Sequence, residues 1–307
     1  MRVSFVVNAE AGNFKGLNVW QRIESELTIA YTMYATEYMG HAADIVSAIG
    51  AARKEAQLVV IIGGDGTLHE AVNGASGYPH LHLGFVKAGS GNDFARAFTC
   101  FQNAMDIEAF VQQPKSTLVD CGEVLFNDGQ TKKFINNFGL GFDAFVSTLV
   151  NESRVKKALN KIGLGKLSYV YFVFQALMKF KPFALEIDSN HKTQTFDNVW
   201  FVTTSNQPYF GGGMNLSPLS KVSDGLLEIT VVNNLSRLKF LLLFLTVFTG
   251  KHTHFKAVTQ FQVTAATFMT DALQLLHTDG ETESLTAKQV QCQVHERSIT
   301  IAKTGAM

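Results

Sequence analysis

Short β-type runs alternate with helical patterns up to about Thr117, and no other feature limits the folds open to this chain as strongly. Strands separated by helices pair most simply as parallel βαβ units. We therefore predict a doubly wound α/β domain over residues 1–117, with ligands bound beyond the carboxyl ends of its strands. The expected strands are Val3–Val7, Thr28–Ala35, Leu58–Ile62 and Leu83–Val86, and helical spacing is found in Val19–Glu26 and His41–Glu55.

After about Ser116 the pattern changes, because β-type runs follow one another with few helical segments between them. We predict a larger antiparallel β-rich domain over residues 118–297, with helical insertions in Val146–Lys181 and Leu238–Phe248. A last strand candidate, Ser298–Ala302, can return to the first domain within residues 298–307. The other runs are Thr117–Val124, Lys133–Phe138, Ala184–Ile187, Asn198–Thr204, Leu226–Val232, Phe261–Ala265 and Gln289–His295.

Composition narrows the class of protein. The chain has 307 residues, 46% of them hydrophobic and 17% charged, which is typical of folded domains and makes two domains the first expectation. Its 26 basic and 26 acidic side chains balance, so nucleic-acid binding has no overall electrostatic source. The three cysteines, Cys100, Cys121 and Cys292, form no close pair, which indicates reduced thiols. We expect a cytoplasmic protein without a nucleic-acid partner.

The apolar run Leu58–Ile62 breaks into Gly63-Gly-Asp-Gly-Thr67 and then into a helical pattern. Glycines let successive backbone N–H groups approach one anion, and a helix start adds partial positive charge. Thr67 and Glu70 have the spacing of a capping box at that start. A carboxylate beside a phosphate site needs a cation, so Asp65 suggests Mg²⁺. The alternative is an ordinary strand–turn–helix joint, since neither a Walker loop nor GxGxxG is present.

A second glycine turn repeats the arrangement about 25 residues later. The run Leu83–Val86 leads into Gly89-Ser-Gly-Asn-Asp-Phe-Ala-Arg96, in which Ser90 can cap a helix with Asp93 at the third position. Two such turns can face each other across the crevice at one edge of a parallel sheet.

Together these two segments resemble the catalytic domain of diacylglycerol kinases and their bacterial relatives, a group related to sphingosine kinases and more distantly to NAD kinases. The resemblance extends over nearly the whole chain, from Asn8 to Glu281. Its further motifs are Asn8-Ala-Glu-Ala-Gly12, Gly139-Leu-Gly-Phe-Asp-Ala144, Gly211-Gly-Gly-Met-Asn-Leu-Ser-Pro218, Lys221-Val-Ser-Asp-Gly-Leu226 and Thr278-Asp-Gly-Glu281.

The resemblance implies an ATP- and Mg²⁺-dependent lipid kinase, with diacylglycerol as the first expectation for the acceptor and phosphatidic acid as the product. It assigns Asp65 and Asp93 to the reacting phosphates and magnesium, and Glu281 to the general base. A second magnesium would be held through Lys221, Asp224 and Leu226, where the lysine and the leucine serve through backbone carbonyl oxygens. The residues assigned to ATP are Asn8, Ala9, Glu10, Ala11, Gly12, Thr36, Gly64, Asp65, Gly66, Thr67, Leu68, His69, Glu70 and Ser90.

This sequence departs from the family pattern at several positions. Ala9 and Ala11 stand where proline and serine are common, and Lys87 stands where a proline is usual. The loss of the proline at Lys87 loosens that turn. Ser223 replaces a frequent aspartate in the second metal segment, which weakens that ion site.

Several alternatives stay open on the sequence. The acceptor can be a sphingoid base, ceramide or another glycerolipid, and the chain can also be an NAD-type kinase or a non-catalytic nucleotide-sensing homologue. We expect transient peripheral contact with a membrane surface that carries the lipid substrate, and a homodimer is compatible with the sequence. The basic, aromatic stretch Val146–Lys181 and the apolar run Leu238–Phe248 either sit on anionic lipid or belong to the core.

Overall fold

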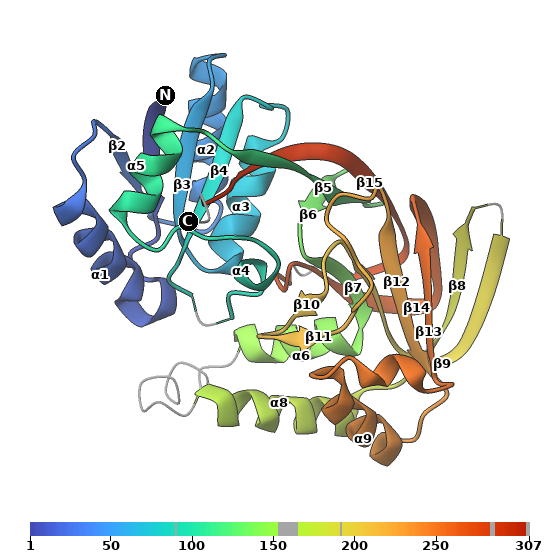
Figure 1. Cartoon of the computed structure of the whole chain (residues 1–307). Coiled ribbons are helices and arrows are strands. Elements are labelled where there is room, and N and C mark those ends of the chain that lie inside the picture. Colours follow the sequence, from blue (N-terminus) through green and yellow to red (C-terminus); the bar gives the residue numbers. More distant parts are fainter. Residues whose placement is uncertain (90, 153–164, 191, 283–285, 305–307) are drawn as a thin grey trace.

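The computed structural model describes residues 1–307 except 90, 153–164, 191, 283–285 and 305–307, and it contains two lobes (Figure 1). The first lobe is built from alternating strands and helices. Its elements are β1 (Arg2–Val7), α1 (Ala11–Glu26), β2 (Thr32–Ala35), α2 (His41–Ala52), β3 (Gln57–Gly63), α3 (Asp65–Ala75), β4 (Leu81–Lys87), α4 (Phe94–Ala97) and α5 (Ala104–Gln112).

The strands of the first lobe are parallel and lie in the order β4-β3-β1-β2. Their register brings the carboxyl ends to one edge, since Val7 pairs with both Ala35 and Ile62, and Gly63 pairs with Lys87. Every residue of β3 is buried, which explains its nearly continuous apolar sequence. This edge carries the glycine turns.

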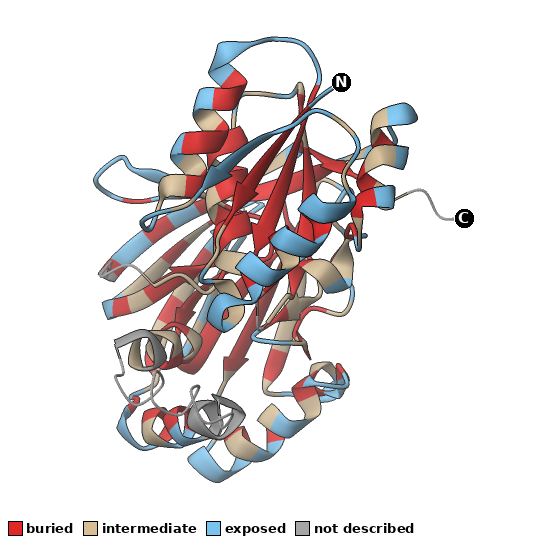
Figure 2. Cartoon of the chain, turned by 90° about the vertical axis from the view of Figure 1, so that its left-hand side faces the viewer, coloured by how far each residue is buried: buried red, intermediate tan, exposed pale blue. Residues whose placement is uncertain are grey.

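Helices cover both faces of these strands. Apolar side chains of α2 and α3, among them Val46 and Val72, pack with alternate strand residues such as Val59. Trp20 of α1 and Ile107 of α5 pack on the opposite face with the intervening residues. Figure 2 shows the resulting pattern, with buried strands in the middle and helices exposed on their outer sides.

The second lobe is mainly antiparallel. Its strands are β5 (Ser116–Leu125), β6 (Thr131–Phe134), β7 (Asn137–Gly141), β8 (Phe183–Ser189), β9 (Lys192–Ser205), β10 (Tyr209–Phe210), β11 (Met214–Asn215), β12 (Leu227–Asn233), β13 (Val258–Val263), β14 (Ala265–Thr278) and β15 (Thr286–Ala302). Within the described residues, the helices that cover it are α6 (Phe142–Glu152), α8 (Gly165–Lys179), α9 (Arg237–Val247) and the 3₁₀ helix η1 (Lys251–His254). A two-domain architecture with a β-rich second domain was predicted, and it is confirmed.

Two neighbouring strands, β15 and β5, run from one lobe to the other. β15 pairs with β14 in the second lobe, and its end pairs in parallel with β4 through Thr300 and Ile301. β5 runs antiparallel beside β15 from one lobe to the other (Figure 1). The result is one continuous 13-stranded sheet.

Two strands were predicted wrongly, and a third was predicted correctly but is longer than expected. The expected run Lys133–Phe138 is divided between β6 and β7, because the chain bends at Ile135 and Asn136. The expected strand Ser298–Ala302 is confirmed together with its return to the first lobe, where it pairs with β4, but it is the end of the longer strand β15. Most of β14 was not predicted, because its sequence mixes exposed polar residues with apolar ones and bulges between Met269 and Gln274.

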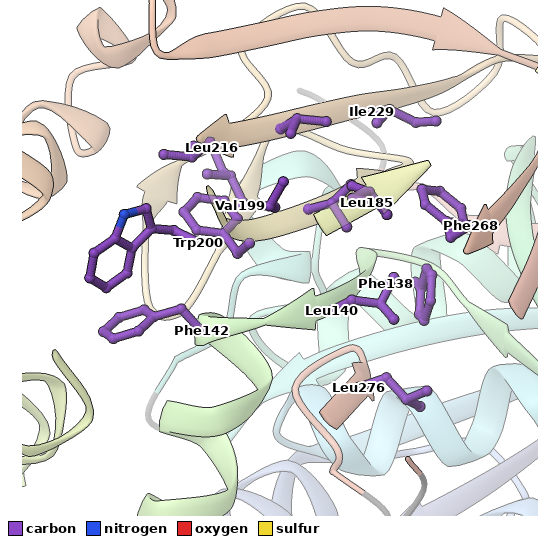
Figure 3. Packing of buried hydrophobic residues seen from close by; sticks show 14 of the residues in the cluster. Phe138, Leu140, Phe142, Leu185, Val199, Trp200, Leu216, Ile229, Phe268 and Leu276 are labelled. Carbon is purple, nitrogen blue, oxygen red and sulfur yellow. The ribbon is translucent and has the colours of Figure 1, made fainter. Parts of the chain in front are cut away.

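The core of the second lobe contains many aromatic side chains, and part of it is drawn in Figure 3. Trp200 of β9 stacks on Phe240 of α9, with ring centroids 4.4 Å apart. Phe142, the first residue of α6, meets the same Phe240 edge-on at 4.8 Å. These contacts hold α6 and α9 against the sheet. Among the described helices, none combines the length and the apolar character that crossing a bilayer requires.

Candidate active site

Three turns meet at the carboxyl edge of the parallel strands. They follow β1 (Asn8–Gly12), β3 (Gly63–Thr67) and β4 (Ala88 and Gly89). The amide of Asn8 donates to the carbonyl of Ile62 at 2.9 Å, and the amide of Ala88 donates to the carbonyl of Gly63 at 2.8 Å. Thr36, directly after β2, donates its amide to the Val7 carbonyl at 2.9 Å and so lies at the same edge.

The close contact between these turns requires glycine. A Cβ on Gly89 would lie 2.5 Å from the Cα of Gly64, so the two glycine turns face each other backbone to backbone. Gly12 has φ +61°, and a Cβ there would collide with the carbonyl oxygen of Ala88. The first turn continues in the left-handed region through Asn13 and Phe14, a conformation that side-chain-bearing residues seldom adopt.

Asn8 links the first turn to the second. Its Nδ2 donates to Thr67 Oγ1 at 3.0 Å, and its Oδ1 accepts from the Ala11 amide at 3.1 Å. The amide side chain therefore fixes the conformation of its own turn and the position of the start of α3.

The expected capping box at α3 is wrong. The helix begins one turn earlier, with Gly64 as its N-cap and no side-chain cap. The Glu70 carboxylate instead accepts from the amides of Gly40 at 2.8 Å and Ala42 at 3.1 Å, where α2 begins. Glu70 thus compensates for the missing cap of the neighbouring helix, and the α3 amides stay available at the edge.

The second helix cap predicted from the sequence also lies at a different residue. The short helix α4 begins at Phe94 after Asp93, and Asp93 makes no side-chain cap bond. Ser90, which the sequence assigned to this cap and to ATP, lies outside the described residues.

Asp65 and Asp93 form an acidic pair at the glycine turns. Asp65 Oδ1 accepts from the Phe94 amide at 3.1 Å, and Asp93 Oδ2 accepts from the Gly212 amide at 2.8 Å. A Cβ on Gly91 would lie 3.0 Å from Asp65 Oδ2 and 3.9 Å from Asp93 Oδ2, so both carboxylates border one small space. Burial, followed by the charge of Asp93, raises the pKa of Asp65 to about 6. Burial also raises the pKa of Asp93.

The donor chemistry of this pair fits a divalent cation. Asp93 Oδ1 is buried and has no hydrogen-bond partner in the described part of the chain, although Arg96 Nε lies 3.6 Å away. Two carboxylates that repel each other, one with an unsatisfied oxygen, are the hard oxygen ligands that Mg²⁺ prefers. Asp65 and Asp93 are therefore the residues that would hold the metal.

Glu281 lies over the start of α3. Its Oε1 occupies the place where a Cβ on Gly66 would point, so only glycine at position 66 leaves room for the carboxylate. Thr278 and Glu281 exchange backbone hydrogen bonds of 3.1 and 2.9 Å around a tight turn. Asp279 and Gly280 both have positive φ in this turn, which is the conformation that Asp-Gly pairs favour. Residues more than 200 positions apart thus meet at the glycine turns.

Asp279 holds this turn in place, and sequence reasoning gave it no role of its own. Its buried carboxylate accepts backbone hydrogen bonds from Ile135 at 3.0 Å, Asn136 at 2.8 Å and Asn137 at 3.0 Å. His69 Nδ1 donates to the same carboxylate at 2.8 Å. The only signal in the sequence was the Asp-Gly pair, which indicates a turn but not its partners.

Several residues assigned to ATP face the protein interior instead. The side chain of Leu68 belongs to the core of the first lobe, and those of His69 and Glu70 bond to Asp279 and to α2. The other assigned residues that the structure describes, Asn8 to Gly12, Thr36 and Gly64 to Thr67, lie at the carboxyl edge.

The second metal segment is a turn before β12. Asp224 Oδ1 accepts from the Leu226 amide at 3.2 Å, and buried Asp120 accepts from the amides of Gly225 and Arg297 at 2.8 Å each. The side chains of Lys221 and Asp224 are exposed. In the part of the chain that the structure describes, no three acidic, histidine or cysteine side chains come together as a ligand set.

Each lobe matches the model of a known protein family. Residues 2–124 match the model of the diacylglycerol kinase catalytic domain, and residues 137–302 match that of the YegS C-terminal NAD kinase beta sandwich-like domain. The chain is 34% identical over 285 residues to "Putative lipid kinase YtlR" of Bacillus subtilis, covering 90% of this chain and 92% of that protein. It is 28% identical over 203 residues to a Mycobacterium tuberculosis protein named "Diacylglycerol kinase", covering 66% and 63%.

Solved structures share the fold. A crystal structure of a protein described as a "putative diacylglycerol kinase" from Bacillus anthracis aligns with a TM-score of 0.76 at 20% identity, over 99% of this chain and 95% of that one. A second structure, with the same description and source, gives a TM-score of 0.74 at 20% identity, over 98% and 97%. Both alignments extend across the two lobes.

Proposed function

The chain belongs to the diacylglycerol kinase family of lipid kinases, and on this premise we propose that it transfers the γ-phosphate of ATP to a lipid hydroxyl, with Mg²⁺. The acceptor we propose is diacylglycerol, which gives phosphatidic acid for phospholipid synthesis. The observation that carries the proposal is the position of Glu281, a carboxylate from the second lobe that lies over Gly66, the residue after Asp65 of the acidic pair.

The residues of the site have separate parts in the proposed reaction. Glu281 takes the proton of the lipid hydroxyl as its oxygen attacks the γ-phosphorus. The bond from that phosphorus to the bridging oxygen breaks, and ADP leaves. The backbone amides of the glycine turns hold the phosphate oxygens. Asp65 and Asp93 would hold Mg²⁺, which when bound supplies neutralising charge for those oxygens.

We further propose that the enzyme works in the cytoplasm as a peripheral protein on an anionic membrane. Support comes from α8 and α9, whose outer sides carry exposed Tyr171, Phe174 and Met178, and Leu238, Leu242 and Leu245. Arg237 Nε of α9 donates to the Leu177 carbonyl of α8 at 2.9 Å, so the two helices are neighbours. The segments 165–181 and 236–257 contain lysine and arginine but no aspartate or glutamate.

A labelled-phosphate assay tests the proposed reaction. The full-length protein is incubated with [γ-³²P]ATP, Mg²⁺ and mixed micelles that contain diacylglycerol, sphingosine, ceramide or monoacylglycerol, and separately with NAD. We expect the label in the organic extract with diacylglycerol. Label that appears only in aqueous NADP would overturn the lipid assignment, and an ATP-binding protein that labels no acceptor would indicate a nucleotide sensor.

Substitution of Glu281 tests the base. Because a positioned general base contributes about 10²–10⁴-fold, Glu281→Gln should lower kcat by that factor while ATP binding and the melting temperature persist. Glu55→Gln is the control, since Glu55 is exposed in the loop before β3. Activity of the Glu281 variant within a few-fold of wild type would contradict the proposal.

A further inference from the structure

The turn that carries Glu281 has a second support, which comes from its own lobe. On the side of the first lobe, His69 contacts Asp279 of the turn. On the other side lies His277, whose side chain is fully buried. Its Nδ1 accepts from the Gly280 amide at 3.2 Å. An imidazole ring therefore holds the residue directly before Glu281.

Asp143 of α6 fixes the other edge of this ring. Its Oδ2 lies 3.1 Å from His277 Nε2 and accepts from Thr203 Oγ1 at 3.0 Å, and its Oδ1 accepts from the Ala144 amide at 2.8 Å. Because Nδ1 accepts from an amide, the ring proton belongs on Nε2, which donates to the carboxylate. Asp143 thus favours the tautomer that can hold Gly280.

Gly139 of β7 makes room for the carboxylate of Asp143. It pairs with His277 of β14 on one side and with Thr203 of β9 on the other, so these three residues form a row across the sheet. A Cβ on Gly139 would collide with Asp143 Oδ2 and would lie 2.5 Å from His277 Nε2. Glycine in the middle of the row lets the carboxylate bridge its two neighbours.

Phe210 of β10 fixes the plane of the His277 ring. The two rings stack with centroids 4.9 Å apart and an interplanar angle of 2°. A Cβ on Gly280 would lie 3.7 Å from Phe210 Cε2, so the phenyl ring also borders the turn. Stacking sets the rotation of the imidazole, and hydrogen bonds occupy both of its nitrogens.

The bond to Gly280 acts on a turn whose shape sets the direction of Glu281. Asp279 and Gly280 have φ values of +53° and +86°, and Thr278 and Glu281 close the turn through their backbone groups. A rotation of the Gly280 peptide plane would swing the Cα–Cβ bond of Glu281. Since a displacement of about 1 Å can cost about 10²-fold in rate, a proposed base on such a turn needs a fixed backbone.

We infer that His277, oriented by Asp143, positions the proposed general base Glu281. It holds the Gly280 peptide, and the Glu281 carboxylate therefore stays over Gly66. The inference rests on the proposed lipid-kinase function and adds to it a positioning residue that acts through the backbone.

Two substitutions separate the hydrogen bonds of His277. His277→Asn places an amide oxygen near the position of Nδ1, where it can accept from Gly280, whereas His277→Gln places an amide nitrogen near Nε2 and keeps only the bond to Asp143. In the micelle assay with diacylglycerol, His277→Gln should lower kcat at least about 10-fold with an unchanged KM for ATP, and His277→Asn should stay within about 3-fold of wild type. A merely structural role would make both losses follow the melting temperature.

His252→Gln is the matched control. His252 is also fully buried in the second lobe, and its Nε2 donates to the Leu216 carbonyl at 2.9 Å, a bond that glutamine can keep. This variant should lower the melting temperature about as much as His277→Gln does and leave kcat per folded molecule unchanged.

Asp143→Ala removes the partner that selects the tautomer. The ring proton can then move to Nδ1, so kcat should fall as in His277→Gln, and this variant replaces the glutamine one if that protein does not fold. Added to His277→Gln, Asp143→Ala should lower kcat little further, because both substitutions break the same path to Gly280.

Measurements without turnover separate this role from the chemistry. In ¹⁵N NMR, the imidazole signal that disappears in His277→Asn should show a proton on Nε2, and a proton on Nδ1 would overturn the inference. Hydrogen exchange of the Gly280 amide should be faster in His277→Gln than in wild type.

The outcomes distinguish the two proposals. A wild type that phosphorylates diacylglycerol, with unchanged kcat in His277→Gln and Asp143→Ala, would overturn the positioning role alone. A wild type that phosphorylates no lipid would overturn the kinase proposal, and the exchange rate of the Gly280 amide would still decide whether His277 holds the turn.

Discussion

Asp65 is a residue whose ionisation the fold alters strongly. Its ordinary pKa is 3.8, and burial together with the charge of Asp93 raises the pKa to about 6. The unfolded chain therefore loses this proton at lower pH than the native protein does. The contribution of the Asp65 carboxyl group to the free energy of unfolding is largest below about pH 4. It falls as the pH rises to about 6 and stays lower above that, by on the order of 2–3 kcal/mol.

Asp65→Asn should remove this penalty while keeping an oxygen that accepts from the Phe94 amide. Without Mg²⁺, the variant should melt several degrees higher than wild type at pH 7.5 and show a flatter Tm between pH 4 and 6. Differential scanning calorimetry at a series of pH values measures both. Equal Tm profiles for the two proteins would contradict the raised pKa.

Bound Mg²⁺ should offset this loss of stability, because it binds the ionised carboxylate of Asp65. Addition of about 10 mM Mg²⁺ should raise the wild-type Tm at pH 7.5 more than at pH 5, where Asp65 is mostly protonated. The Asp65→Asn variant serves as the control, since its Tm should respond weakly at both pH values. An equal wild-type response at both pH values would argue against Asp65 as a ligand.

Gly66 gives a selective probe of the base. An alanine Cβ at this position would meet Glu281 Oε1, the end of a flexible side chain, so the carboxylate should move without unfolding the protein. We expect Gly66→Ala to keep or raise stability by up to about 1 kcal/mol, since alanine suits a helix better than glycine, and to lower kcat at least about 10-fold.

The control for this variant is Gly74→Ala in the same helix. Its Cβ would collide with the Ala43 backbone of α2, so this variant should lose stability rather than turnover per folded molecule. Thermal melts and single-turnover kinetics distinguish the two effects. Full activity of Gly66→Ala would show that Glu281 does not act from this position.

At the residue scale, the sequence predicted the glycine turns but not their supporting bonds. Gly63–Thr67 and Gly89–Gly91 were found because backbone contact leaves a glycine signature. The roles of Glu70 and Asp279 depend on partners in α2 and in the bend at Ile135 and Asn136, which no local pattern reveals. A capping-box spacing at Thr67 and Glu70 proved misleading for the same reason.

Among the elements, α9 is unusual because both its buried and its exposed sides carry large apolar residues. One side packs into the core of the second lobe, and the other faces outward next to α8. A helix of this kind at a protein surface commonly marks an interaction site. The lysines around it and the absence of acidic residues in 236–257 favour an anionic bilayer.

We expect the double substitution Leu242→Glu and Leu245→Glu to reduce binding to vesicles of phosphatidylcholine with 30% phosphatidylglycerol at least about 10-fold. Two exposed apolar contacts are lost and two repulsive charges are added. Vesicle co-sedimentation measures the bound fraction. Met105→Glu on α5, an exposed apolar site of the first lobe, is the control. Unchanged binding of the double variant would exclude this face as the contact.

At this scale the helices were easier to predict than the long strands. The apolar run Leu238–Phe248 became α9 almost at its expected bounds, and His41–Glu55 became α2 with a slightly earlier end. β15 was underestimated because it passes between the lobes and changes its neighbours along its length, and β14 because its pairing with β15 is interrupted between Met269 and Gln274. Buried and exposed residues therefore do not alternate regularly along β15.

For the whole molecule, the continuous sheet predicts cooperative unfolding of the two lobes. The chain has two tryptophans, Trp20 in the core of the first lobe and Trp200 in that of the second. Trp20→Phe and Trp200→Phe each leave one reporter. Within each variant, urea unfolding followed by tryptophan fluorescence and by far-UV circular dichroism should give coincident midpoints, because β15 belongs to both lobes.

Separate transitions in either variant would show that β15 does not couple the lobes. Ser298→Pro alters the shared strand itself. Ser298 lies where the register of β15 with β5 shifts, between His295 and Ile299. If the strand transmits stability, this substitution should lower the midpoint reported by each tryptophan.

The path of β15 also constrains synthesis on the ribosome. β4 is complete at Lys87 and can pair with β3, but its second parallel neighbour is made only when Thr300 and Ile301 emerge, more than 200 residues later. Until then one side of β4 presents unpaired backbone groups to other nascent chains. At roughly 5–20 residues per second, that interval lasts on the order of ten seconds or more. During it, the first lobe depends on chaperones or on its own early helices to stay unaggregated.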